Sequence, residues 1–187
     1  MLITIDQLRA IMPNAGERAR IYFTPLTEAM AEFDIDNRLR VAAFLAQIAH
    51  ESGELRYSRE IWGPTEAQRR YSDREDLGNT NPIAIQAAEH NGDNTGHFYR
   101  GRGLIQITGY YNYVDATEAL GVDLVTNPKL AELPDFSARI AAWFWKTHGC
   151  NKLADEQKFK TITRRINGGL NGYDDRVKYY NRALTVL

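Results

Sequence analysis

Two glutamates, Glu51 and Glu60, are the side chains in this sequence best suited to do chemistry. Glu51 ends a strongly apolar stretch, where removing a carboxylate from water costs free energy unless the carboxylate has a partner or a function. Desolvation disfavours the charged form of a carboxyl, and a carboxyl that stays protonated near neutral pH can act as a general acid. Glu60 follows nine residues later, past Gly53, so it cannot share a helix face with Glu51 but can lie across a cleft from it.

Such a pair suits inverting cleavage of a glycosidic bond, in which one carboxyl protonates the leaving oxygen and the other activates a water. Glu54, Glu66 and Glu75 compete with Glu60 for the second role, and spacing alone does not choose among them. The residues by themselves therefore predict Glu51 as the acid and leave the second carboxylate open.

The histidines do not indicate a metal site. His50 and Glu51 begin the H-E-x-x-H pattern of zinc proteases, but the position of the second histidine is occupied by Glu54. The other histidines are scattered along the chain, which does not resemble metal-ligand spacing. We expect no metal and no cofactor, with His50 packing against or orienting the acid.

The composition is that of a soluble globular protein. Hydrophobic residues make up 43% and charged residues 25% of 187 residues, which predicts one domain over 1–187 with its own core. A net charge of −1 provides no field that would gather nucleic acid, so a DNA-binding protein is disfavoured. Cys150 is the single cysteine and cannot form an internal disulfide, which favours a reducing compartment and a spectator thiol. The N-terminus lacks a signal-peptide pattern, and no stretch has transmembrane length.

The elements that must position these side chains are predicted to be helices, because no segment shows sustained period-2 alternation. A capping box of Thr4 and Gln7 opens a first helix that Pro13 stops. Thr24 is predicted to cap a second helix with Pro25 at its first position. Further helices are expected from Asp36 to about Gly53, after Pro64 and Pro82, over 110–120 and 135–149, and on either side of the NGGLNG turn, with a loop over 91–103 and an extended piece over 104–108.

Four separated segments resemble glycoside hydrolase family 19, which contains the plant-type chitinases and related bacteriophage endolysins. They are FLAQIAHESGEL, YSREIW, FYRGRGLIQITGYYNY, and RRINGGLNG with an arginine downstream. Together they span residues Phe44 to Arg176, and the third is the most specific. The resemblance implies a mainly α, lysozyme-like or chitinase-like domain with a substrate cleft and little or no β structure.

The resemblance also implies roles for individual residues. Glu51 would be the acid and Glu60 the base, and Arg176 would match an arginine behind the base. Many chitinases have a serine where this chain has Thr108, which keeps the hydroxyl, and a glutamate where it has Asn171, which shortens any charge network around the base. The remaining expected site residues are Thr108 and Asn112 on the water and acetamido group, Gln106 and Tyr111 in the cleft wall, His50 beside the acid, and Asn167 and Arg176 on the substrate side.

Aromatic residues offer flat faces and hydroxyls to carbohydrate. We expect Trp143 and Trp145 in the core. The expected cleft aromatics are Tyr57, Trp62, Tyr99, Tyr110 and Tyr111.

The resemblance implies a monomeric endolysin that cuts peptidoglycan, accumulates in the host bacterial cytoplasm and depends on a phage holin for release. Chitin is the alternative substrate. A lytic transglycosylase is a rival, because Glu51-Ser52-Gly53 and Gly103-Leu104-Ile105-Gln106 also resemble that family, although Glu60 and the Asn-Gly-Gly turn favour a hydrolase. An inactive carbohydrate-binding protein is disfavoured because both glutamates are present.

Overall fold

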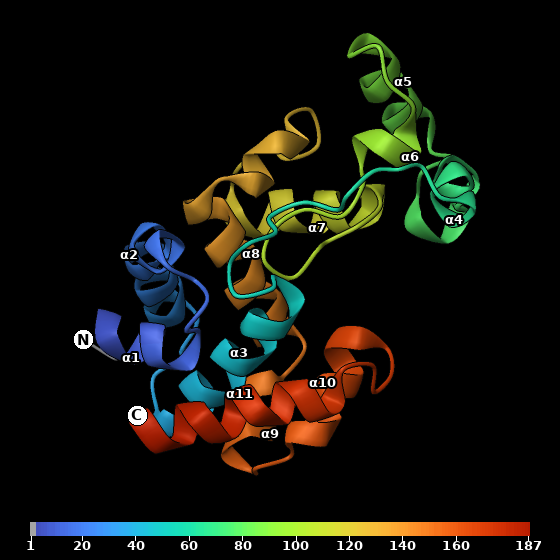
Figure 1. Cartoon of the computed structure of the whole chain (residues 1–187). Coiled ribbons are helices and arrows are strands. Elements are labelled where there is room, and N and C mark those ends of the chain that lie inside the picture. The colour runs from blue at the N-terminus through green and yellow to red at the C-terminus, as the bar shows by residue number, and fades with distance from the viewer. Residues whose placement is uncertain (1–2) are drawn as a thin grey trace.

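The structure, a computed structural model, describes residues 3–187 and is built almost wholly from helices (Figure 1). The helix α3 (Arg38–Glu51) runs through the centre of the larger body and packs along α11 (Tyr173–Val186). Around this pair lie α1 (Ile5–Ile11), α2 (Glu17–Glu32), α8 (Pro134–Thr147), α9 (Cys150–Asp155) and α10 (Phe159–Asn167).

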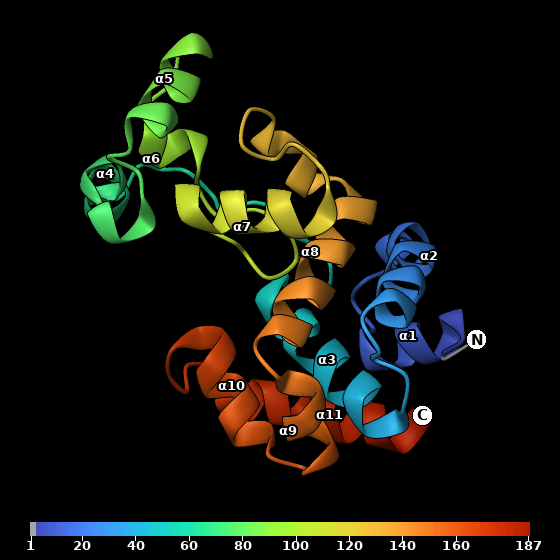
Figure 2. The same ribbon diagram turned by 180° about the vertical axis from the view of Figure 1, so that it is seen from behind.

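The smaller body contains the short helices of the middle of the chain. It is built around α7 (Tyr110–Leu120), and the segments before it project from the larger body at one end (Figure 2). These segments are α4 (Glu66–Arg69), α5 (Pro82–His90), α6 (Thr95–Phe98) and two 3₁₀ turns, Tyr71–Asp73 and Glu75–Leu77. A third 3₁₀ turn, Pro128–Glu132, follows α7.

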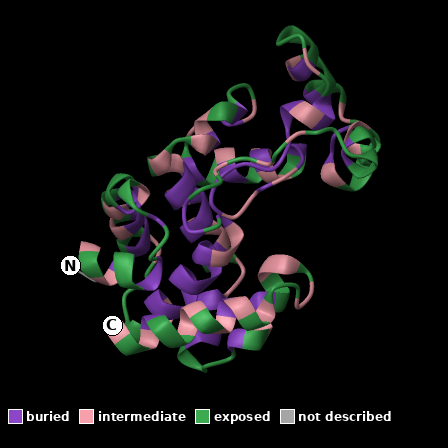
Figure 3. Ribbon diagram, viewed as in Figure 1, coloured by how far each residue is buried: buried purple, intermediate pink, exposed green. Residues whose placement is uncertain are grey.

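Helix α3 is buried on every side, as its composition predicts. Every residue from 41 to 49 is buried, and a helix that is apolar all round belongs in a core. Figure 3 shows it as the buried centre of the larger body. Asn37 rather than Asp36 is its N-cap, because the Asn37 side chain accepts a hydrogen bond from the Arg40 amide at 3.0 Å. The burial fixes the place where the helix ends, and so the place of Glu51.

Helix α8 joins the two bodies because it contributes to two hydrophobic clusters. Ala138, Ala141 and Trp145 pack into the cluster of the larger body, and Ile140 packs with the residues of α7. Trp145 meets Phe44 edge to face, with ring centroids 5.5 Å apart. Trp145 is fully buried, as predicted, whereas Trp143 is only partly buried against the smaller cluster.

The mainly helical prediction is confirmed, including the capping box at Thr4, but some boundaries were wrong. Helix α2 begins at Glu17 and passes through Pro25, so Thr24 is not its cap. A proline inside a helix loses one backbone hydrogen bond, and here it is buried on the same apolar face as Leu26 and Met30, which offsets that loss. The predicted loop over 91–103 contains the short helix α6. The predicted extended piece over 104–108 forms only an isolated bridge, between Arg102 and Ile107. Helix α9 was not predicted.

No helix within residues 3–187 is both long and apolar enough to cross a bilayer.

Candidate active site

Glu51 is the last residue of α3, where it meets an arginine from α11. Its Oε1 accepts a hydrogen bond from Nη2 of Arg176 at 2.6 Å. The Arg176 side chain is fully buried, whereas 18% of the Glu51 side chain stays exposed. The surroundings of Glu51 are therefore more polar than the sequence predicted, and part of its side chain remains accessible from the surface.

Arg176 is held by a buried polar network. Its Nη1 donates to Oε1 of Gln47 at 2.5 Å, and its Nε donates to the carbonyl of Asn171 at 3.3 Å. Gln47 in turn donates to the hydroxyl of Thr163 at 2.9 Å. The prediction for Arg176 was wrong in two respects: it lies behind the acid Glu51 rather than behind the base, and complete burial keeps it from touching a substrate.

His50 is fixed on the same side of the larger body. Its Nδ1 lies 2.8 Å from Oδ2 of Asp175, in the first turn of α11. Gly172 packs directly on the imidazole, where a Cβ would come within 2.1 Å of His50 Cε1, and its φ of +68° also requires glycine. His50 is thus held by Asp175, a partner that the sequence did not reveal, and its expected role beside Glu51 stays a prediction.

Asn167 ends α10 at the Asn-Gly-Gly turn. Its Oδ1 is buried and accepts no hydrogen bond from any group in residues 3–187. Buried acceptors in folded proteins are nearly always satisfied, so the missing partner of this oxygen is unusual. Contact between Asn167 and substrate remains a prediction.

Glu60 lies in an extended segment that pairs with the glycine-rich loop. Its amide donates to the carbonyl of Gly101 at 2.8 Å, and the Gly103 amide donates to the carbonyl of Ser58 at 2.8 Å. These bonds fix the segment at Ser58 and at Glu60 and therefore limit where the Glu60 carboxyl can lie.

Three donors converge on the Glu60 carboxyl. Oε1 accepts from Nε2 of Gln68 at 2.8 Å and from the Tyr71 hydroxyl at 3.2 Å, and Oε2 accepts from the Gly101 amide at 3.1 Å. Burial, reinforced by Glu60 itself, raises the pKa of Tyr71, so its phenol stays a donor. A set made only of donors matches an ionised carboxylate, which only accepts.

Gly101 brings the residues around Glu60 together. A Cβ on Gly101 would lie 2.9 Å from Oε1 of Gln106, 3.2 Å from Oγ1 of Thr108 and 3.4 Å from Cβ of Glu60. Gln106 is held in a left-handed conformation, with φ +57°, and donates to the carbonyl of Gly103 at 2.7 Å. Asn112 donates to the Thr108 carbonyl at 2.6 Å. The structure thus brings these four predicted residues into one cluster.

Gln68 and Tyr71 were missed by reasoning from the sequence. A signal for Gln68 existed, because Thr65 and Gln68 form a capping box at the start of α4, with the Thr65 amide donating to Gln68 Oε1 at 2.8 Å. That bond turns Nε2 of Gln68 toward Glu60. Nothing local to the sequence indicates Tyr71.

The aromatic predictions divide by exposure. Tyr57 and Tyr111 are 38% and 49% exposed and remain available to a ligand. Tyr99 and Tyr110 were predicted in the cleft wrongly: both are buried, and they pack with Tyr113 and Ala116 in the smaller cluster. Trp62 is partly exposed and meets Tyr71 and His97 edge to face.

The competing carboxylates are engaged elsewhere. Glu54 is only 5% exposed, and its carboxyl accepts from the Asn14 amide at 2.5 Å, the Asn14 side chain at 2.9 Å and the Tyr179 hydroxyl at 2.9 Å. Glu66 is exposed at the surface and pairs with Arg70 at 3.0 Å, and Glu75 is also exposed. Glu60 is therefore the best candidate for the second carboxylate.

Replacing Glu54 with glutamine should reduce stability more than catalysis. The glutamine NH₂ would face donors on Asn14 or Tyr179, and a buried polar group left without its partner costs about 1–3 kcal/mol. Urea unfolding should show this loss, while the turnover of the folded protein stays within about threefold. Glu60→Gln is the matched variant and should lose turnover in the folded protein. Loss of activity in a folded Glu54→Gln protein, with an active Glu60→Gln, would move the base to Glu54.

Cys150 is not a nucleophile in this fold. It is fully buried, and burial raises the pKa of its thiol to about 12. Because the thiolate is the reactive form, the thiol is inert at neutral pH. The predicted spectator role fits this environment.

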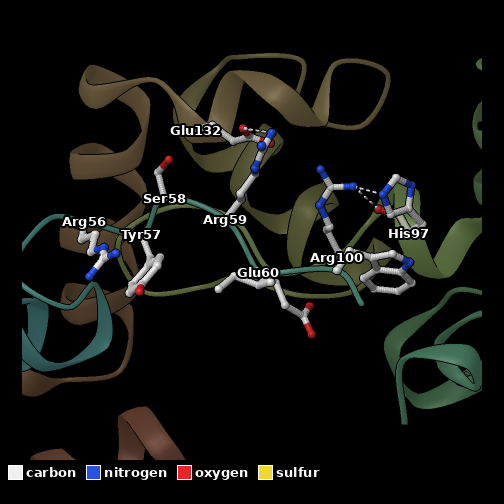
Figure 4. Close-up of a pocket in the computed structure, with 10 residues that line it drawn as sticks. Arg56, Tyr57, Ser58, Arg59, Glu60, His97, Arg100 and Glu132 are labelled. Atoms are coloured by element: carbon white, nitrogen blue, oxygen red, sulfur yellow. Dashed lines mark hydrogen bonds and ion pairs between the residues drawn. The ribbon is translucent and has the colours of Figure 1, made fainter. Parts of the chain in front are cut away.

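The segment that carries Glu60 has two different faces. Figure 4 shows the Glu60 carboxyl pointing to one side, while Arg59 and Arg100 point to the other, toward Glu132 and His97. The Glu60 carboxyl and the two arginines thus point to opposite sides of the segment, although all three residues line one hollow.

Comparison with known proteins shows one enzyme family throughout. The family model described as chitinase class I matches residues 23–161. A glycosyl hydrolase family 19 domain-containing protein of Haemophilus influenzae is 39% identical over 204 residues, which cover 100% of this chain and 97% of that protein. An endochitinase of Arabidopsis thaliana is 37% identical over 147 residues, 75% of this chain and 45% of the plant protein. The chain thus spans about half the length of such plant relatives.

Solved structures share the fold. Chitinase C from Streptomyces griseus HUT6037 has a TM-score of 0.77 at 24% identity, over 99% of this chain and 76% of that one. A bacterial family 19 chitinase has a TM-score of 0.77 at 23% identity, over 100% of this chain and 95% of that one. With the matched family model and the Haemophilus relative, the conclusion is that this chain is an enzyme that belongs to glycoside hydrolase family 19.

Proposed function

We propose that the protein hydrolyses β-1,4 bonds between N-acetylated amino sugars, with Glu51 as general acid and Glu60 as general base. The observation that carries this proposal is the cluster around Glu60, in which three donors hold the carboxylate beside Gln106 and Thr108. Such a carboxylate has fixed geometry and can accept a proton from a water molecule.

Each residue then has a defined step. Glu51 gives its proton to the leaving glycosidic oxygen as the bond from C1 to that oxygen breaks. Glu60 takes a proton from a water whose oxygen forms the new bond to C1, and the Thr108 hydroxyl holds that water. The Arg176 cation on Oε1 of Glu51 stabilises the negative charge that remains once the proton has left.

This mechanism predicts inversion at the anomeric carbon. The two carboxyl groups of an inverting glycosidase are roughly 6.5 to 9.5 Å apart, which leaves room for a water. Proton NMR of the first product of a β-linked N-acetylglucosamine oligosaccharide should therefore show the α anomer before mutarotation. A first product in the β configuration would contradict the water-activating role of Glu60.

For the substrate we propose peptidoglycan, with the protein acting as a muramidase-type endolysin that lyses a bacterial host. One cysteine, fully buried and without a partner for a disulfide, suits storage in the reducing bacterial cytoplasm. Release to the wall would then depend on a phage holin, and a monomer suffices for the proposed chemistry. Chitin is the second candidate, because the plant relatives are endochitinases and the similar solved structures are chitinases.

One experiment separates these substrates. Purified protein should clear chloroform-permeabilised Gram-negative cells and create new reducing ends in the released muropeptides, and Glu51→Gln is the control. Hydrolysis of chitin oligosaccharides without clearing would assign chitin instead. Anhydro-sugar ends in the muropeptides, detected by mass spectrometry, would show a lytic transglycosylase.

A further inference from the structure

A groove lies along the Glu60 segment, beside the arginines of that segment and of the glycine-rich loop (Figure 4). It consists of two adjoining hollows of about 600 and 680 Å³, which share Arg59, His97 and Arg100. We name it the arginine groove. Its further lining includes Asn91, Asn127, Lys129, Leu130 and Leu133, together with the acidic residues Glu60, Asp93 and Glu132.

Arg100 is the unusual member of this lining. Only 8% of it is exposed, and its Nε has no hydrogen-bond partner within residues 3–187. Its Nη1 contacts Nε2 of His97 and lies 3.5 Å from the His97 carbonyl. No carboxylate in the part of the chain that the structure describes forms an ion pair with it.

The nearby carboxylates are already engaged. Glu132 accepts from Nε of Arg102 at 2.8 Å and lies 3.6 Å from Nη1 of Arg59. Asp93 lies 2.6 Å from Nδ1 of His97, which leaves the other ring nitrogen of His97 to face Arg100. The groove therefore contains a buried guanidinium that forms no ion pair within the described residues, although the charge of Glu132 acts on it from farther away.

A buried charge without a counter-ion is costly unless a ligand supplies one. Burial, together with the neighbouring Arg102, lowers the pKa of Arg100, yet a guanidinium stays protonated at neutral pH. Lys129 is exposed at the rim and adds a second positive charge. The group that satisfies this site is an anion with oxygen acceptors, and a carboxylate matches the planar guanidinium fork.

The size and lining of the groove indicate a ligand larger than a free ion. Its hollows fall within the usual range for ligand sites of roughly 300–1,000 Å³. Leu133 is 48% exposed beside Leu130, and the amides of Asn91 and Asn127 can pair with peptide groups. Apolar, amide and cationic side chains together suit a short peptide that carries a carboxylate.

We propose that the arginine groove binds an acidic peptide, with a carboxylate held by Arg100. The identification of that peptide rests on the proposed function: peptidoglycan carries acidic peptides on its sugars, whereas chitin carries neither peptide nor charge. The groove would then distinguish the two polymers by the charge of the peptide. The arginine groove would prefer a peptide carboxylate whichever glycosidic bond of the polymer is cleaved.

Binding should be measured by calorimetry with three probes: the L-alanyl-γ-D-glutamyl-diaminopimelate tripeptide, the same tripeptide with its carboxylates amidated, and inorganic phosphate. The tripeptide should bind, and amidation should weaken binding at least about 10-fold, because charge-assisted hydrogen bonds are roughly twice as strong as neutral ones. Equal binding of the amidated form, stronger binding of phosphate, or no binding of the tripeptide would each overturn the proposal.

Variants locate the binding in the groove. Arg100→Gln should weaken tripeptide binding at least about 10-fold, and Lys129→Gln should weaken it about twofold at low salt, because exposed charges contribute little. Arg20→Gln is the matched control, since Arg20 is exposed on α2 and outside the groove. If Arg100→Gln does not fold, the double variant Arg59→Gln/Lys129→Gln must weaken binding at least about threefold. Unchanged binding in that double variant would contradict the proposal.

Hydrolysis of neutral N-acetylglucosamine oligosaccharides keeps the two proposals distinguishable. Lys129→Gln should cut these oligosaccharides at the wild-type rate and should cut peptidoglycan more slowly. Hydrolysis of sugars without tripeptide binding rejects the arginine groove alone. Tripeptide binding by a folded protein that hydrolyses no glycan rejects the proposed function alone.

Discussion

Replacing Glu51 with glutamine should lower turnover at least about 100-fold while the protein stays folded. A positioned general acid contributes about 10²- to 10⁴-fold to the rate, and an amide cannot give up a proton to the leaving oxygen. Steady-state rates on a glycan with a good leaving group should recover part of the loss, because such a group needs less protonation. The turnover number should fall far more than KM rises.

Glutamine is the appropriate replacement because of Arg176. The side-chain carbonyl oxygen of the introduced glutamine would still accept the hydrogen bond that Oε1 of Glu51 accepts at 2.6 Å. Alanine would leave a fully buried guanidinium without its partner, a change that costs about 3–5 kcal/mol and confuses catalysis with unfolding. Near wild-type rates in folded Glu51→Gln would remove Glu51 from the mechanism.

The sequence was sufficient where local chemistry decides the structure. The apolar residues that precede Glu51 required a buried helix, and the structure buries every residue from 41 to 49. The capping box at Thr4 formed as predicted.

Prediction failed where partners are distant in the chain. Arg176 lies 125 positions from Glu51, and no local pattern could decide whether it served the acid or the base. Asp175 reaches His50 over the same separation. Tyr99 and Tyr110 resembled cleft aromatics by composition, but only the packing of the smaller body shows that they are buried. In each case tertiary packing decided the outcome, whereas the sequence supplied only the residue type.

Helix α2, which passes through Pro25, is another case in which tertiary packing overrides a local sequence rule. Local rules place proline at a helix start, where its missing amide hydrogen is harmless. In this chain the helical face that contains Leu26 and Met30 is fully buried, and burial of such side chains contributes about 1.5–3 kcal/mol each. That gain is comparable with the cost of about 3 kcal/mol for an interior proline, so the helix continues.

Replacing Arg176 with methionine should destabilise the protein by about 3 kcal/mol, the low end of the cost of breaking a buried ion pair, because Glu51 keeps 18% of its side chain exposed. The loss also includes the buried Gln47 oxygen, which would no longer receive the bond of 2.5 Å from Arg176. Urea unfolding should show a lower midpoint with an unchanged slope. Arg176→Lys keeps the positive charge, but one ammonium cannot reproduce the contacts of the guanidinium with both Gln47 and Glu51. The free energy of unfolding of Arg176→Lys should therefore lie between those of Arg176→Met and the wild type.

The catalytic effect of Arg176 separates a positioning role from a merely structural one. If Arg176 acts through Glu51, folded Arg176→Met should lose about 100-fold in turnover, as when one group that stabilises a developing charge is removed. In the Glu51→Gln background the same change should then cost little more, because residues that act as a unit are not additive. Losses that multiply in the double variant would show that Arg176 supports the active site only through the stability of α3 and α11. Wild-type turnover in folded Arg176→Met would show that catalysis by Glu51 does not depend on Arg176.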